Sequence, residues 1–207
     1  PTRSSCATIF PPARGGRVFA AGLLLLAGAA AKADGELSSA LCGLLFSAER
    51  YAEAVKPCRE AAEAGDAVAM FNLGVMYHKG RGVPQDYAQA LFWFRKAAEK
   101  GVPAAMNNLG VMYDNGQGVA QDYAQALHWY RKAAEAGSAG AMFNLGLMYL
   151  DGLGVAQDYA QALFWFRKAA EAGDAGAMFN LGVMYDNGRG VPQDYAQALH
   201  WYRKAAE

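Results

Sequence analysis

The sequence predicts an all-α solenoid built from stacked antiparallel helix pairs. The first reason is a strict period of 36 residues, which is typical of arrays whose units bury their apolar faces against their neighbours. The second is that apolar residues inside each unit recur at helical spacing, with no strand-like alternation. A Leu-Gly pair and the tetrad Tyr-Ala-Gln-Ala mark the period, beginning at Leu73, Leu109, Leu145 and Leu181 and at Tyr87, Tyr123, Tyr159 and Tyr195.

Residues 1–33 differ from the rest of the chain and have the order of a secretory signal peptide. Basic residues come first, an apolar run over 18–31 follows, and Ala31-Lys32-Ala33 supplies the small residues that signal peptidase reads. We therefore expect cleavage before Asp34 and an exported, periplasmic or secreted protein. An uncleaved membrane anchor is the alternative, although the apolar run is short for a span. Without residues 1–33, which carry four basic and no acidic side chains, the formal charge changes from 0 to −4.

Residues 34–65 form a degenerate first unit, which we interpret as a capping helix pair. Tyr51 opens the tetrad Tyr-Ala-Glu-Ala in register with Tyr87, but the preceding turn is shorter than in the later units. Cys42 and Cys58 fall at inward positions on the two helices, nearly equidistant from the turn. A disulfide between them is expected, and on the chain-entropy model it would contribute about 3 kcal/mol. Two buried free thiols are the alternative.

The first helix of each repeat is predicted from one apolar face. In the repeat over 66–101, Asp66 is placed to cap the helix, and Met70, Leu73 and Tyr77 recur at i, i+3 and i+7. Gly74 lies on the same face, where glycine costs about 1 kcal/mol relative to alanine. Because a glycine recurs there in all four repeats, we expect two helix backbones to approach closely at this point.

A rigid turn and a second helix complete the repeat. Gly80 and Gly82 permit positive φ angles, and Pro84 prevents the first helix from continuing. Asp86 is predicted to cap the second helix, with Gln89 closing a capping box. The same reading places the four repeats at 66–101, 102–137, 138–173 and 174–207.

The repeated pattern resembles that of the Sel-one-like repeat (SLR) family, a relative of the tetratricopeptide repeat. The shared pattern is Ala-x-x-x-Leu-Gly-x-x-Tyr-x-x-Gly-x-Gly-Val-x-x-Asp-x-x-x-Ala-x-x-Trp-Tyr-x-x-Ala-Ala-x-x-Gly, found over 69–101, 105–137, 141–173 and 177–207. The resemblance implies a right-handed α/α superhelix whose concave face binds peptides or proteins. Some secreted, cysteine-rich members are associated with β-lactam chemistry, but those carry a disulfide in nearly every repeat.

A row of asparagines on the first helices is the candidate peptide-binding site. In tetratricopeptide repeats the corresponding helix lines the concave surface, and an amide both donates and accepts hydrogen bonds, which suits an extended backbone. The alternative is that each amide bonds to a neighbouring repeat and stiffens the stack. The four residues are Asn72, Asn108, Asn144 and Asn180.

Differences between the copies concentrate at the end of the first helix and in the turn. Positions 78–79 and 81 and their equivalents differ, as do Phe71, Asn107, Phe143 and Phe179. Positions that are free to differ are usually exposed. We interpret these differences as determinants of partner choice or as drift.

No motif for catalysis, metal binding or a cofactor is recognisable. His128 and His200 lie two repeats apart, about 20 Å at ordinary helix spacing, so one metal ion cannot bind both. Nucleophile-elbow, zinc-protease, P-loop and serine β-lactamase motifs are absent. The zero formal charge gives no sign of nucleic-acid binding.

The sequence thus predicts an exported, non-enzymatic scaffold that binds a protein or peptide, with no metal, cofactor or nucleic-acid partner. A membrane partner is expected only if the leader is uncleaved. Two alternatives stay open: a hydrolase of cell-wall or β-lactam chemistry, and a structural spacer. The oligomeric state does not follow from the sequence.

Overall fold

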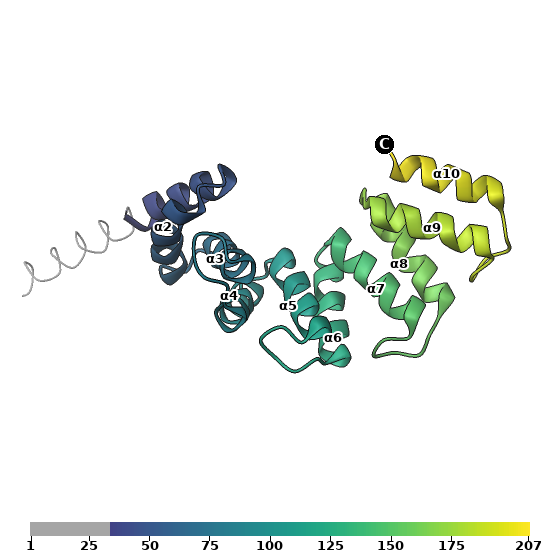
Figure 1. Ribbon diagram of the computed structural model, residues 1–207, viewed down its shortest axis with the longest axis horizontal. Coiled ribbons are helices and arrows are strands. Elements are labelled where there is room, and N and C mark those ends of the chain that lie inside the picture. Colours follow the sequence, from purple (N-terminus) through teal and green to yellow (C-terminus); the bar gives the residue numbers. More distant parts are fainter. Residues whose placement is uncertain (1–33) are drawn as a thin grey trace, which may run out of the picture.

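The computed structural model describes residues 34–207, and every regular element in that range is a helix. A helix over residues 34–47, called the N-terminal helix below, is followed by nine shorter ones in the described part of the chain. These are α2 (Tyr51–Glu63), α3 (Ala67–Lys79), α4 (Tyr87–Glu99), α5 (Pro103–Asn115), α6 (Tyr123–Glu135), α7 (Ala139–Asp151), α8 (Tyr159–Glu171), α9 (Ala175–Asn187) and α10 (Tyr195–Ala205). Consecutive helices pack in pairs along an arc (Figure 1). The predicted all-α solenoid is confirmed.

Capping at both ends fixes the bounds of the repeated helices. Asp86 caps α4, because its Oδ1 accepts a hydrogen bond from the Gln89 backbone N–H at 3.0 Å. The expected capping box is not completed: the Asp86 N–H donates to the Tyr77 carbonyl instead, which ties the start of α4 to the end of α3. Gly80 ends α3 in the left-handed conformation, with φ of 66°.

Within each pair, a glycine of the first helix lies against an aromatic ring of the second. A Cβ atom built on Gly74 would come within 2.5 Å of the Phe94 ring, and one on Gly110 within 2.5 Å of the Tyr130 ring. Our expectation of a close approach between two backbones was therefore wrong, because the glycine makes room for a ring. The ring fills the space between helices, and Phe94 and Tyr130 are each only 1% exposed.

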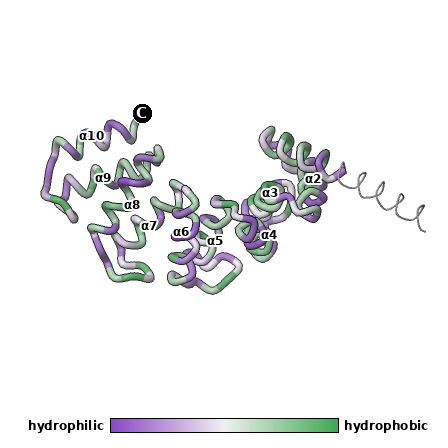
Figure 2. The backbone as a smooth tube through the Cα atoms, turned by 180° about the vertical axis from the view of Figure 1, so that it is seen from behind, coloured by the Kyte–Doolittle hydropathy of each residue, from purple (hydrophilic) through white to green (hydrophobic). Residues whose placement is uncertain are grey.

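Successive repeats are joined by the second glycine of each turn. Gly118 has φ of 70°, and a Cβ atom there would meet the backbone of Tyr87, the first residue of the preceding repeat's second helix, at 2.9 Å. A side-chain bond from the second helix supports the same junction, since Arg95 Nη2 donates to the Tyr113 hydroxyl at 2.7 Å. Figure 2 shows hydrophobic and hydrophilic residues interspersed along the helices, as expected for helices that bury one face and expose another.

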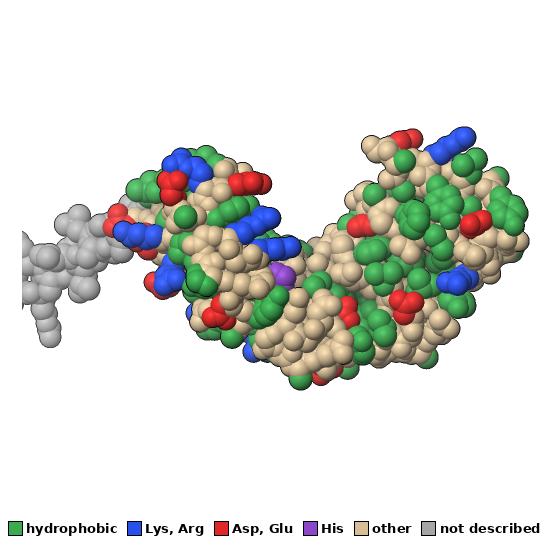
Figure 3. Space-filling model, in the orientation of Figure 1, with side chains coloured by type: hydrophobic (Ala, Val, Ile, Leu, Met, Phe, Trp, Pro, Cys, Tyr) green, Lys and Arg blue, Asp and Glu red, His purple; other side chains and the backbone are tan. Residues whose placement is uncertain are grey.

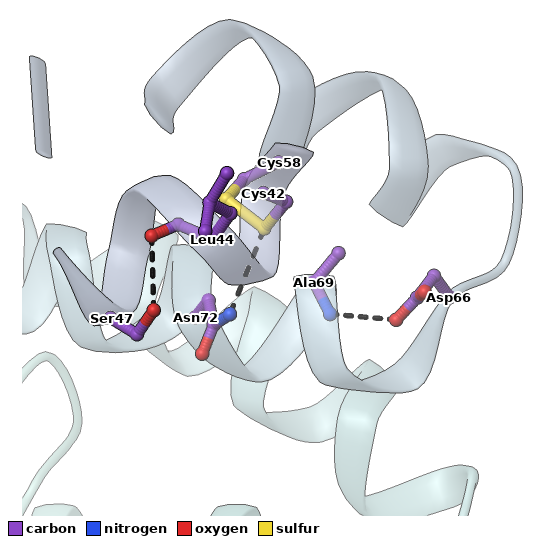
Figure 4. The surroundings of a disulfide bond; sticks show 7 residues. All are labelled: Cys42, Leu44, Ser47, Cys58, Asp66, Ala69 and Asn72. Atoms are coloured by element: carbon purple, nitrogen blue, oxygen red, sulfur yellow. Dashed lines mark hydrogen bonds between the residues drawn. A yellow bond between two sulfur atoms is a disulfide. The ribbon is translucent and has the colours of Figure 1, made fainter. Parts of the chain in front are cut away.

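The N-terminal helix and α2 form a hairpin, called the capping hairpin below after its expected role, which is cross-linked by the Cys42–Cys58 disulfide (Figure 4) with a Cα–Cα distance of 4.6 Å. The pairing is the one expected from the sequence. The hairpin turn takes residues 48–50, whereas the turn from α3 to α4 takes residues 80–86. Allowing for that shorter turn, Cys42 and Cys58 occupy the places of Gly74 and Phe94. The disulfide therefore replaces the glycine–ring contact of the other repeats.

The expected signal peptide over 1–33 lies outside the described residues. Among the helices that are described, none has the length and apolar character needed to cross a membrane.

Candidate binding surface

The first helices of the repeats lie side by side and build the inner side of the arc. Helix α3 contacts α5 directly, and α7 contacts α9, in addition to the contacts of each helix with its own partner. Figure 1 shows α3 and α5 nearer the open side of the arc than α4 and α6, and the space-filling view is hollowed on that side (Figure 3). We call this the inner surface, formed by α3, α5, α7 and α9.

The four predicted asparagines lie on these helices, but their surroundings differ. Asn72 is 5% exposed beneath the capping hairpin, where its Nδ2 donates to Cys42 Sγ at 3.7 Å (Figure 4), so a partner cannot reach it. Asn144 Nδ2 donates to Asn107 Oδ1 at 3.0 Å, and Asn180 Nδ2 donates to the Gly176 carbonyl at 2.9 Å. The amide oxygens of Asn144 and Asn180 make no hydrogen bond to another described residue.

Asn108 is the member of the row whose amide has no hydrogen-bond partner in the described part of the chain. It is half-buried on α5, between the covered Asn72 and the bonded Asn144. A half-buried amide has four hydrogen-bonding positions to satisfy, and a ligand backbone supplies both donors and acceptors. The accessible row is thus Asn108, Asn144 and Asn180 rather than all four.

Asn107 joins this surface although the sequence analysis treated it only as a variable position. The other repeats carry phenylalanine there, and Phe71 and Phe143 pack against the rings of Phe94 and Phe166 at 5.9 Å between centroids. The exchange of phenylalanine for asparagine at one position of a strict repeat was the available signal. Its consequence is a polar side-chain pair, Asn107 and Asn144, bridging α5 and α7.

The variable turn residues at position 79 and its equivalents are exposed, as expected, and so is Arg81, but some of the variable residues also contact a neighbouring repeat. His78 Nε2 lies 2.8 Å from Gln117 Oε1 of the next turn. Arg81 donates to the hydroxyl of Tyr51 at 2.8 Å and its guanidinium also lies over that ring. Variation at these positions therefore changes how neighbouring repeats are joined.

The pKa values of one buried pair depart from their ordinary values. Tyr130 donates its hydroxyl to Asp114 Oδ2 at 3.3 Å between α6 and α5. Burial raises the pKa of Tyr130 well above its usual range, and the nearby Asp114 charge and hydrogen bond raise it further. Burial also raises the pKa of Asp114, although the Tyr130 hydroxyl opposes that change. This hydrogen bond joins the two helices of one repeat, and it explains why Tyr130 occurs together with Asp114.

The outer side of the arc carries aromatic side chains covered by lysines. Lys96 Nζ lies 4.6 Å from the centre of the Phe92 ring and 5.3 Å from that of Trp93, and Lys168 repeats the arrangement over Phe164 and Trp165. These contacts are cation–π pairs within one helix. The lysines therefore cover the faces of aromatic rings on their own helix.

The described residues contain no cluster of three or more His, Cys, Asp or Glu side chains arranged to hold a metal ion. The inner surface presents a row of amides beside apolar side chains such as Phe143. Such groups bind polypeptide by hydrogen bonding and apolar contact.

The sequence model for the Sel1 repeat matches residues 67–102, 103–138, 139–174 and 175–207, which is more than half of the chain. The chain belongs to the Sel1 repeat family. Members of this family are generally non-catalytic interaction modules that bind proteins. Comparison with curated protein sequences gave no significant match.

Several solved structures have the same fold. A protective antigen of uropathogenic Escherichia coli with an SLR fold is 42% identical with a TM-score of 0.75, and the match covers 85% of this chain and 38% of the antigen. A Sel1 repeat protein of Oxalobacter formigenes is 39% identical with a TM-score of 0.76, covering 82% of this chain and 72% of that protein. An immunity protein of Pseudomonas aeruginosa is 26% identical with a TM-score of 0.57, over 84% and 64%. This chain thus spans well under half the length of the E. coli antigen.

Proposed function

We propose that this Sel1 repeat protein is an exported scaffold that binds an extended segment of a protein partner along its inner surface. The supporting observation is the half-buried Asn108 amide, which has no hydrogen-bond partner among the described residues. Asn144 and Asn180 continue the row with unpaired amide oxygens. Helices that pack side by side place such side chains at intervals of about 10 Å, so the row suits a ligand that runs along the array.

The geometry favours an extended peptide over a folded docking domain or a small molecule. An extended strand rises about 3.3 Å per residue, so every third residue of a ligand would meet the next asparagine. Amides that form hydrogen bonds with a peptide backbone can bind peptides of many sequences. The peptide side chains between these contacts then determine which peptides bind best. Phe143 and Phe179 lie on the same helices and offer apolar contacts to those side chains.

Binding can be tested with a peptide library displayed on phage and selected against the immobilised chain. The affinity of selected peptides is then measured by fluorescence anisotropy. Two lost hydrogen bonds of about 0.5–1.5 kcal/mol each predict that the double variant Asn108→Ala/Asn144→Ala binds roughly 5- to 150-fold more weakly.

The matched control is Gln125→Ala/Gln161→Ala, which removes two exposed amides from the second helices α6 and α8. That variant should bind as the wild type does. Failure to select any peptide, or an equal loss in both variants, would contradict binding on the inner surface.

We further propose that residues 1–33 direct export and are removed before Asp34. The Cys42–Cys58 disulfide supports this proposal, because disulfides persist in oxidising compartments. Intact mass of the protein recovered from the periplasm of a bacterial host should begin at Asp34 and be two hydrogens lighter than the reduced chain. Retention of the leader, or free thiols at both positions, would argue against export.

A further inference from the structure

The inner surface carries one charged side chain of each sign. Each first helix turns one stripe of residues toward the hollow of the arc, and in α3 this stripe consists of positions 68, 71, 72, 75 and 79, which recur at helical spacing. Across the four repeats these positions hold apolar residues, glycine and asparagine, with two exceptions. The exceptions are Lys79 in the first repeat and Asp151 at the equivalent position of the third.

Both charged side chains are available to a ligand. Lys79 and Asp151 are exposed, and neither forms an ion pair or a side-chain hydrogen bond with another residue in the range 34–207. In contrast, charged residues elsewhere in the same range are paired with each other, as Arg50 is with Glu53. An exposed charge at the end of an otherwise uncharged stripe attracts a ligand group of the opposite sign.

Charged neighbours at the same edge of the inner surface reinforce this order. Arg81 follows Lys79 in the turn and is exposed, although it also bonds to a tyrosine hydroxyl. Asp114 adds negative charge at the end of α5, although it accepts a hydrogen bond from a tyrosine. In the fourth repeat, Asp186 and Arg189 have opposite signs and largely cancel. The surface is therefore positive at α3 and negative at α5 and α7, which follow one another along the arc (Figure 1).

The spacing of the two charges suits a short extended peptide. Lys79 and Asp151 occupy equivalent positions of α3 and α7, so two helix spacings, about 20 Å, separate them. An extended strand rises about 3.3 Å per residue and covers this distance in about six residues. Between the two charges the strand would pass Asn108 and Asn144.

We propose that the partner segment bound by the inner surface carries an acidic residue at Lys79 and a basic residue about six positions away at Asp151. This inference rests on the proposed function and adds the chemistry of the ligand. The asparagines recur in every repeat, so they hold a peptide equally well when it is shifted by one repeat or reversed. The two charges do not recur, and a shifted or reversed peptide would lose both ion pairs or bring like charges together. Lys79 and Asp151 thus determine the register and the direction of the ligand.

A charge swap tests the proposal. A random peptide library displayed on phage is selected in parallel against wild type and against Lys79→Glu/Asp151→Lys, which keeps the net charge and changes two exposed side chains; circular dichroism checks the fold. Peptides selected on wild type should share an acidic and a basic residue about six positions apart in one fixed order. Those selected on the swapped variant should share the reverse order.

The affinities of the selected peptides, measured by fluorescence anisotropy, give the size of the effect. An exposed ion pair changes affinity by a factor of about 1.4–5. The swap removes two attractions and adds two repulsions of similar size, so peptides selected on wild type should bind the variant at least about fourfold more weakly. The difference should shrink in 1 M salt, where exposed charges are screened beyond about 3 Å.

The matched control is Lys96→Glu/Glu171→Lys, which makes the same exchange on α4 and α8, the second helices of the same two repeats. It should change affinity less than twofold. If selected peptides lose affinity in Asn108→Ala/Asn144→Ala but show no charge pattern and bind the swapped variant normally, the charge assignment is overturned and the proposed function stands. If no peptide is selected, both fail. An equal loss in the swap and in its control would also overturn the assignment.

Discussion

At the scale of single residues, the space that a glycine leaves for one aromatic ring determines how the two helices of each repeat pack together. The glycine at position 74, 110, 146 or 182 has a helical backbone, so its conformational freedom is not what requires it. The requirement is steric, because a Cβ atom would lie 2.5 Å from an aromatic carbon of the paired helix. The cost of glycine in a helix, about 1 kcal/mol, is offset by burial of the ring.

Substitutions at two glycines of the same helix separate the steric requirement for glycine from its general cost in a helix. Gly146→Ala in α7 forces a Cβ atom against the Phe166 ring and should destabilise the protein by about 1–3 kcal/mol, the usual cost of overpacking. Gly140→Ala meets nothing closer than 3.8 Å and should stabilise it by up to about 1 kcal/mol. Urea unfolding followed by circular dichroism measures both. Equal effects of the two substitutions would remove the steric explanation.

The Tyr130–Asp114 pair gives a second test at this scale. Tyr130→Phe leaves the partly buried Asp114 carboxylate without its donor and should cost about 1 kcal/mol. The third repeat carries Phe166 and Leu150 at the same two positions. Adding Asp114→Leu to Tyr130→Phe copies that combination and should recover the loss in urea unfolding. A double variant less stable than Tyr130→Phe alone would show that the two positions are not coupled.

The raised pKa of Tyr130 predicts a loss of stability in alkali. Above about pH 10 tyrosine ionises in the unfolded chain, while burial keeps Tyr130 protonated in the folded one. The folded state then binds more protons, so the free energy of unfolding falls as pH rises, by about 1.4 kcal/mol per pH unit for one fully protected group. Tyr130→Phe should lose less stability than wild type over this range. Parallel stability curves for the two proteins would contradict the assignment.

At the scale of elements, the capping hairpin uses a disulfide where the other pairs use a ring. Removing the cross-link by Cys42→Ser/Cys58→Ser should cost about 3 kcal/mol on the chain-entropy model. Because the two cysteines occupy the places of Gly74 and Phe94, Cys42→Gly/Cys58→Phe should rebuild the glycine–ring contact of the other repeats. This variant should therefore lose less stability than the serine variant. Thermal unfolding of the two double variants decides this. If the Gly/Phe variant is the less stable one, the hairpin does not pack as the repeats do.

The elements were predictable from the sequence because their signals are local. Caps such as Asp86, turn glycines such as Gly80 and the helical spacing of Leu73 and Tyr77 all lie within a few residues of the feature they specify. What the sequence left open depends on which side chain of another helix lies opposite. The ring beside Gly74 and the sulfur beside Asn72 are contacts of that kind, and near-identical copies cannot distinguish a covered asparagine from an accessible one.

At the scale of the whole molecule, stability depends on how strongly each repeat is coupled to the next. In an array with contacts only between neighbours, total stability is close to a sum of unit and junction terms, and weakening one central junction divides the cooperative unit. Gly154 lies at such a junction, between the second and third repeats. Its φ is 69°, and a Cβ atom there would lie 2.8 Å from the Tyr123 carbonyl oxygen.

Gly154→Ala should therefore separate unfolding into two transitions, one for each half of the array. Gly137→Ala is the matched control, because Gly137 connects the same two repeats with φ of 88° but has no atom within 4 Å of a built Cβ. Both substitutions carry the cost of a left-handed alanine, about 1–2 kcal/mol, but only the first disturbs the contact with Tyr123. Urea unfolding should show one shifted transition for Gly137→Ala and two for Gly154→Ala. A single transition in both variants would mean that the helix contacts alone couple the repeats and that the turn glycine contributes nothing to the junction.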